Sequence, residues 1–106
     1  MRKTLEEKRL ELHETLCTNL GSRNVYFQPP SSVKMSYPAI VYSRDAITNA
    51  HANNNPYIND VRYRITLISK DPDNSVIDKM LALPLCGYDR SYAADNLNHD
   101  VFTLYY

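Results

Sequence analysis

The sequence is poor in the residues from which many catalytic and metal sites are built. Its 106 residues include two glycines, two cysteines, three histidines and no tryptophan. So few glycines leave no glycine-rich loop that could hold a phosphate group. Cys17 and Cys86 have neither CxxC spacing nor a histidine at the sequence spacing of a zinc site. We therefore expect reduced thiols, no metal and no cofactor.

The chain also lacks an excess of either charge. Twelve basic and twelve acidic residues give a formal net charge of zero. Binding to nucleic acid by phosphate neutralisation needs a basic surplus or a clustered basic face, so this class of partner is not expected. The charges are nevertheless separated, because all four glutamates lie within the first 14 residues. A neutral chain with separated charges suits head-to-tail association of identical copies.

Long hydrophobic runs are a third absence. No apolar run approaches the length that crosses a membrane, and the first residues are too acidic for a secretion signal. We expect the protein to be made in the cytoplasm, to make no contact with a membrane, and to leave only as part of an assembled particle.

Two amphipathic helices are predicted. The first begins after Thr4, because Thr4 and Glu7 have the spacing of a capping box, and it ends at Gly21. The second follows a turn at 71–75 and ends before Pro84. Leucines spaced for one face of the first helix should pack on a sheet. They are Leu5, Leu12, Leu16 and Leu20.

Five segments rich in β-branched and aromatic residues predict strands. They are 25–27, 39–42, 61–67, 101–106 and 86–92, the last of which is either a strand or an extended loop. In 61–67 apolar and polar residues alternate, so we expect one buried face and one wet or interfacial face that carries Arg62 and Arg64. The order of the elements predicts one α+β domain over 1–106, with two helices packed on a mainly antiparallel sheet of four to five strands.

Two regions outside this regular pattern are candidates for contacts. The last predicted strand, 101–106, is expected at an edge of the sheet, where it could extend the sheet of a neighbouring subunit. Residues 49–56 are expected to form a loop, because four of the eight are asparagine. This loop is either an arm that orders on a partner or an ordinary surface connection. Arg62 and Arg64, similarly, either form ion pairs between subunits or are solvated.

No arrangement of residues predicts catalysis. An enzyme would have to use His51 with His99 and Asp100, or the pair Asp71 and Asp73. Neighbouring side chains on a strand point to opposite faces, so His99 and Asp100 cannot act together as base and orienting group. The 71–73 pair resembles the start of a calcium loop, but the glycine and the final glutamate of that loop are missing. We expect no catalytic residue.

Four blocks, in order along the chain, resemble the small tail-completion or tail-terminator (neck) proteins of long-tailed bacteriophages and prophages. The blocks read VYFQPP at 25–30, YPAIVY at 37–42, YRITLISKDP at 63–72 and DNLNHDVFTLY at 95–105. Each block is a strand with its turn, so the resemblance lies in their order and in the total length. It covers nearly the whole chain after the first helix.

The resemblance implies an α+β subunit that closes into a ring, commonly of six, by heterologous contacts. Such a ring caps the tail tube and joins it to the head connector, by recognition and occlusion without catalysis. The implied partners are further copies, the tail-tube protein and the connector proteins. The protein would act in the host bacterial cytoplasm during assembly and then in the virion. A head-completion or connector adaptor is the alternative within the particle; a small enzyme or a nucleic-acid-binding module is the alternative outside it.

The family has no active-site motif, so the expected interface residues come from this sequence alone. They fall into three groups: the asparagine-rich loop, the arginine face, and the segment that enters the last strand. The residues are Asn53, Asn54, Asn55, Arg62, Arg64, Asn96, His99 and Asp100.

Overall fold

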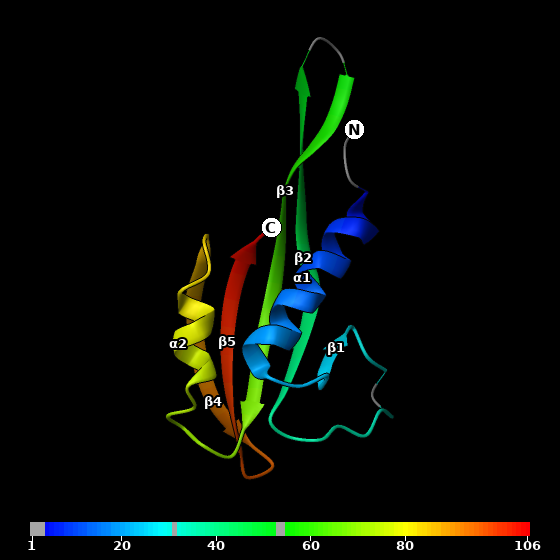
Figure 1. The fold of residues 1–106 in the computed structure, drawn as a ribbon. Helices are drawn as coiled ribbons and strands as arrows, with labels where there is room; N and C mark the ends of the chain where they lie inside the picture. Colours follow the sequence, from blue (N-terminus) through cyan, green and yellow to red (C-terminus); the bar gives the residue numbers. More distant parts are fainter. Residues whose placement is uncertain (1–3, 31, 53–54) are drawn as a thin grey trace.

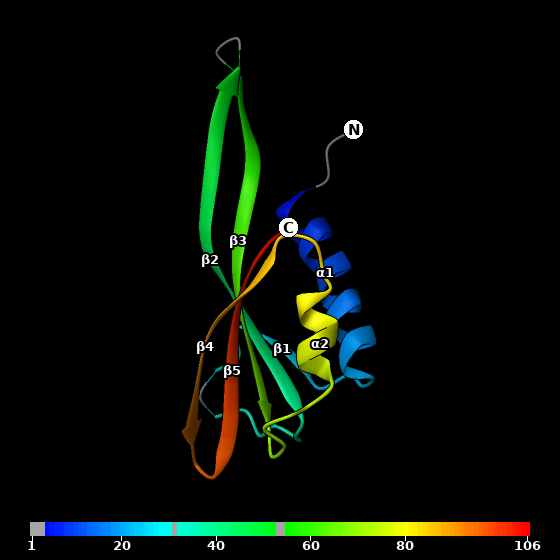
Figure 2. The same ribbon diagram turned by 90° about the vertical axis from the view of Figure 1, so that its left-hand side faces the viewer.

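A computed structural model describes residues 4–30, 32–52 and 55–106. Five strands form one mixed sheet, and two helices cover one of its faces (Figure 1). Seen from the side, both helices lie on the same side of the sheet (Figure 2). The molecule is elongated, with extents of 51 × 26 × 22 Å, because two strands continue beyond the body. The predicted α+β architecture is confirmed.

The elements follow the expected order, helix, three strands, helix, two strands. The helices are α1 (Leu5–Leu20) and α2 (Val76–Leu81). The strands are β1 (Val25–Phe27), β2 (Ala39–Ala52), β3 (Asn55–Ser69), β4 (Cys86–Ala94) and β5 (Leu97–Tyr105). Their order across the sheet is β1-β2-β3-β5-β4. β1 runs parallel to β2, and every other pairing is antiparallel.

The ends of α1 confirm the capping prediction. The Glu7 N–H donates to the Thr4 hydroxyl at 3.1 Å, and the Thr4 N–H donates to the Glu7 carboxylate at 3.3 Å. At the other end, Gly21 adopts a left-handed φ of 79° and its N–H donates to the Cys17 carbonyl at 2.8 Å. A side chain is disfavoured at that φ, so glycine suits the position.

The core lies between the helices and the sheet, and β3 contributes most of its central part. Val61, Tyr63, Ile65 and Leu67 are at most 1% exposed. Arg62, Arg64 and Thr66 alternate with them and are half-buried or exposed. The predicted alternation of this strand is therefore confirmed. Leu12 and Leu16 of α1 and Met80 of α2 are fully buried in the same core, whereas Leu10 is 49% exposed.

The expected loop at 49–56 is wrong. Residues 49–52 belong to β2 and residues 55–56 to β3, with Ala52 directly opposite Asn55. Asparagine favours turns because its side chain bonds to nearby backbone, but strand preference depends strongly on the partner strand. Pairing with β3 therefore extends β2 far beyond the predicted 39–42. Asn53 and Asn54 lie outside the described residues.

The expected edge position of the last strand is also wrong. β5 pairs with β3 on one side and with β4 on the other, so it lies inside the sheet. A two-residue turn at Asp95 and Asn96, with φ of 53° and 63°, makes β4 and β5 a hairpin. This hairpin places β4, not β5, at the edge. The opposite edge is the short strand β1.

The far part of the β2–β3 hairpin is a two-stranded ribbon, formed by residues 47–52 and 55–61 (Figure 1). β1 pairs with β2 only as far as Tyr42, and β5 pairs with β3 only from Arg62 onward. Among the described residues, no third strand pairs with either arm of the ribbon. The Val61 carbonyl accepts the Tyr106 N–H at 3.0 Å. Otherwise both outer edges of the ribbon present backbone N–H and C=O groups that no described strand of this chain binds.

Truncating Leu16 tests the packing of α1 on the sheet. Leu16 is fully buried, so Leu16→Ala should lower the free energy of unfolding by about 2 to 5 kcal/mol. Leu10→Ala in the same helix is the matched control and should change it by less than about 0.5 kcal/mol, because Leu10 is 49% exposed. Urea denaturation measures both; equal losses would contradict the packing.

Candidate functional site

The arginine face is held together by a carboxylate that the sequence did not indicate. Asp45 lies at a bulge in β2, where the register shifts between Arg44 and Ala46. The Arg62 Nε–H donates to Asp45 Oδ2 at 2.8 Å, and a guanidinium nitrogen of Arg64 lies 4.0 Å from the same oxygen. A hydrogen bond with Tyr105, and then the contacts with Asp45, raise the pKa of Arg62. The structure thus brings the two predicted arginines together, and Asp45 partly balances their charge.

The segment that enters β5 contains one exposed residue, one half-buried residue and one buried residue. Asn96 is exposed in the β4–β5 turn. The half-buried His99 ring stacks on Tyr92, with centroids 4.7 Å apart and an interplanar angle of 13°. Asp100, also predicted as a contact residue, is only 5% exposed in the folded chain. Its Oδ1 accepts a hydrogen bond from the Tyr88 hydroxyl at 2.9 Å.

Asp100 is buried because of its position in the sheet. It lies opposite Leu67 of β3, whose side chain is in the core, and opposite Ser91 of β4. Side chains alternate along a strand, so Asp100 faces inward with Phe102, as the sequence argument about His99 and Asp100 requires. Asp100 Oδ2 is buried and has no hydrogen-bond partner among the described residues.

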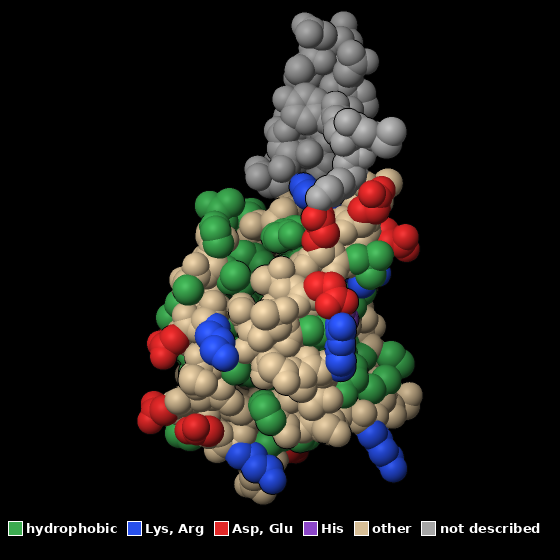
Figure 3. All heavy atoms as spheres, in the orientation of Figure 1, with side chains coloured by type: hydrophobic (Ala, Val, Ile, Leu, Met, Phe, Trp, Pro, Cys, Tyr) green, Lys and Arg blue, Asp and Glu red, His purple; other side chains and the backbone are tan. Residues whose placement is uncertain are grey.

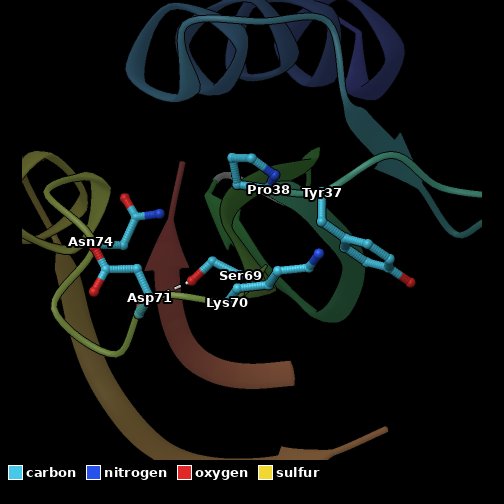
Figure 4. Close-up of a pocket in the computed structure, with 6 residues that line it drawn as sticks. All are labelled: Tyr37, Pro38, Ser69, Lys70, Asp71 and Asn74. Carbon is cyan, nitrogen blue, oxygen red and sulfur yellow. Dashed lines mark hydrogen bonds between the residues drawn. The ribbon is translucent and has the colours of Figure 1, made fainter. Parts of the chain in front are cut away.

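A hollow at the lower end of the sheet shows no catalytic arrangement (Figure 4). The Ser69 hydroxyl donates to the Asp71 backbone carbonyl at 3.0 Å, and the Asp71 carboxylate accepts the Asp73 N–H at 2.9 Å. The Tyr37 ring points away from Asp71 and Asn74 (Figure 4). The Asp71 carboxylate therefore stabilises the turn before α2 by binding the backbone of Asp73. The lining residues are Tyr37, Pro38, Ser69, Lys70, Asp71 and Asn74.

A second hollow is lined mainly by apolar side chains. It lies between α1, the α2–β4 connection and the last residues of β5. Exposed Leu81 and Leu85 lie nearby, and Figure 3 shows hydrophobic side chains gathered beside α2 on this face. Such a surface suits contact with another protein better than a reaction. The lining residues are Leu12, Thr15, Leu83, Pro84, Leu85, Leu104, Tyr105 and Tyr106.

The clearest polar cluster surrounds Phe27, at the end of the edge strand β1. The guanidinium carbon of Arg9 lies 4.4 Å from the centre of the Phe27 ring, and that of Arg44 lies 5.4 Å from it. The Phe27 ring in turn packs against Tyr42, with centroids 5.0 Å apart. Arg44 also lies 6.0 Å from the centre of the Tyr63 ring. Three elements, α1, β1 and β2, therefore place two cations on one aromatic ring.

His13 adjoins this cluster. Its Nδ1 lies 2.7 Å from the Tyr42 hydroxyl oxygen, which is hydrogen-bond distance. Burial, and then the charge of Arg9, lower the pKa of His13 below its ordinary value of 6.5. Burial raises the pKa of Tyr42, and the nearby Arg9 opposes that rise. The spacing of Arg9 and His13 places both on one face of α1, but nothing in the sequence links them to Phe27 or Arg44.

Comparison with known proteins adds no family to this picture. No protein-family model and no curated protein matches the chain. In the described part of the chain, no group of three His, Cys, Asp or Glu side chains is placed to hold a metal ion. None of the helices described is long and apolar enough to span a bilayer.

The environment of His13 predicts a pH dependence of stability. Because its pKa is lower in the folded state than the unfolded value of 6.5, the unfolded chain binds the proton more tightly. The free energy of unfolding should therefore fall as the pH is lowered below 6.5. His13→Gln should make this fall smaller. Urea titrations of both proteins on either side of pH 6.5 measure the difference; identical pH dependence would contradict the assignment.

The Tyr88–Asp100 hydrogen bond predicts a difference between two similar tyrosines. Tyr88→Phe should lower the free energy of unfolding by about 1 to 3 kcal/mol, because it leaves a buried carboxylate without its donor. Tyr92→Phe in the same strand should have little effect, because stacking on His99 needs only the ring. The two tyrosines are 46% and 47% exposed, so the comparison is matched. Equal effects in urea denaturation would exclude the stabilising role of this bond.

Proposed function

We propose that this protein is a structural subunit of a bacteriophage tail, a tail terminator or completion factor. In this proposal copies join into a ring, with six as the expected number, at the junction of tail and neck. The ring caps the tail tube and receives the head connector. The four sequence blocks that resemble this family support the proposal, and the shape of the β2–β3 ribbon supports self-assembly.

The ribbon is the observation that carries the proposal. A two-stranded hairpin is at best marginally stable in water, and a third strand or a packed helix is usually needed. Among the described strands, none pairs with the outer edge of β3 before Arg62 or with the outer edge of β2 after Tyr42, so the ribbon has no third strand. An edge with unpaired backbone groups is a template for a strand of another chain. Pairing with a neighbouring copy would supply the missing partner.

The positions of the free edges favour a ring over a symmetric pair. One open edge is β2 beyond β1, and the other edge of the sheet is β4, on the opposite side. Two different edges on opposite sides allow heterologous, head-to-tail contacts, and these close into a ring when the rotation between subunits permits. The exposed side chains of β4 agree with an edge that faces outward.

The function that follows is recognition and occlusion. A ring has two faces, so one can meet the tail-tube protein and the other the connector. Arg64 and Asn96 remain candidates for these contacts because both are exposed. Arg62 is a weaker candidate, because its charge is already engaged by Asp45. Asn55 begins β3 at the tip of the ribbon, where a contact with another subunit would lie.

A charged residue on the ribbon tests assembly. Ile47 is 43% exposed and lies opposite Val61 near the base of the ribbon. Ile47→Lys should prevent association, because the lysine charge would have to be buried between subunits. Size-exclusion chromatography with light scattering measures the oligomer, alone and with tail-tube protein. The variant should remain a folded monomer under conditions in which the natural protein associates.

Leu10→Lys is the matched control, because Leu10 is 49% exposed and lies on α1, not on the ribbon. This variant should still associate. If Ile47→Lys and the natural protein form the same oligomer, the ribbon is not the assembly element. A natural protein that stays monomeric at high concentration and also ignores tail tubes and connectors would overturn the proposed function.

A further inference from the structure

The positive charge around Phe27 is not neutralised within the described part of the chain. No carboxylate described there lies within ion-pair distance of Arg9 or Arg44. Both arginines are half-buried, so water only partly solvates them. The other arginines on nearby strands differ, because Arg62 and Arg64 share Asp45. Partly burying two cations without a counter-charge lowers the stability of a fold, and buried charges are rarely left unpaired.

Two buried polar atoms next to these cations also lack partners. The Arg44 Nε is buried without a hydrogen-bond acceptor, and the hydroxyl of the fully buried Tyr63 has no partner among the described residues. Arg44 lies over the Tyr63 ring, so the two unpaired groups belong to one neighbourhood. A buried donor without an acceptor costs about 1 to 3 kcal/mol, and such groups are few in native proteins. Arg9 hydrogen-bonds to the Tyr42 side chain, whereas the Arg44 Nε–H in the same cluster lacks an acceptor.

We propose that Arg9 on α1 and Arg44 on β2, both in contact with Phe27, form a binding site for an oxyanion. The oxyanion is either a carboxylate or a phosphate group. Guanidinium groups donate in a fixed fork that matches both kinds of oxyanion. Contact with the aromatic ring holds each guanidinium in place, which reduces the entropy lost on binding. Partial burial strengthens the attraction compared with a fully solvated arginine.

The place of this site in the fold indicates how a ligand reaches it. Phe27 ends β1, and β2 continues past it toward the ribbon, so the site lies beside the point where the edge of β2 becomes open. A carboxylate of a protein that docks along this edge would approach the Phe27 ring that both guanidinium groups contact. A free phosphate group could enter from the same side. The oxyanion site does not require that subunits assemble into a ring, so the test of this site is independent of the proposed function.

Thermal unfolding at constant ionic strength tests the site with two probes, inorganic phosphate and a short peptide of glutamates. At about ten times the dissociation constant, a probe that binds should raise the unfolding midpoint by about 5 °C. The rise should be lost in Arg9→Gln and in Arg44→Gln. Arg90→Gln, at an exposed position on β4, should keep it. The probe with the larger rise identifies phosphate or a protein carboxylate as the natural ligand.

The ring of His13 gives a second readout that does not depend on stability. An anion beside Arg9 would offset the cation that lowers the pKa of His13, so a bound probe should raise that pKa in an NMR titration. The other groups facing the ring, Glu14, Arg23 and Tyr42, are the same with and without the probe. No midpoint rise with either probe would overturn the site. So would rises or pKa changes that persist in both glutamine variants.

Discussion

The central strand β3 is the element on which the rest of the fold depends. Its inward residues, among them Tyr63 and Ile65, are fully buried beneath the helices. Along its length β3 pairs with β2 on one side and, from Arg62 onward, with β5 on the other. Burial of one face fixes the register, because a slip of one residue would move every apolar side chain to the solvent. The length over which β2 and β5 each pair with β3 then sets how far the sheet extends on either side.

The unequal lengths of these neighbouring strands produce the two features on which the proposals rest. β1 stops at Phe27, while β2 continues to Ala52, so one edge of β2 is open and the ribbon extends without a third strand. At that same point Arg9 and Arg44 meet the Phe27 ring. The open edge of β2 and the arginine cluster around Phe27 thus lie side by side. In the two proposals, a strand of another copy would pair with this edge and an oxyanion would bind this cluster.

Polar groups elsewhere in the molecule serve the fold. Asp100 receives the Tyr88 hydroxyl, Asp71 stabilises the turn before α2, and Asp45 joins Arg62 to Arg64. Each of these three carboxylates has a local structural partner. The exposed surface instead offers apolar side chains and backbone edges, such as Leu85 beside the hollow at the chain's end. The proposed assembly would use such surfaces for contacts between subunits.

The sequence by itself determined the features that depend on near neighbours. The capping box at Thr4, the stop at Gly21 and the alternation that buries Tyr63 were all predictable, because each rests on residues a few positions apart. Only the tertiary structure decided the length of β2 and β3, the inner position of β5 and the burial of Asp100. These depend on which strand lies alongside, and pairing overrides the turn preference of the asparagines. The cluster around Phe27 is of the same kind, since its arginines lie 35 positions apart in the sequence and meet only when α1 packs beside β1 and β2.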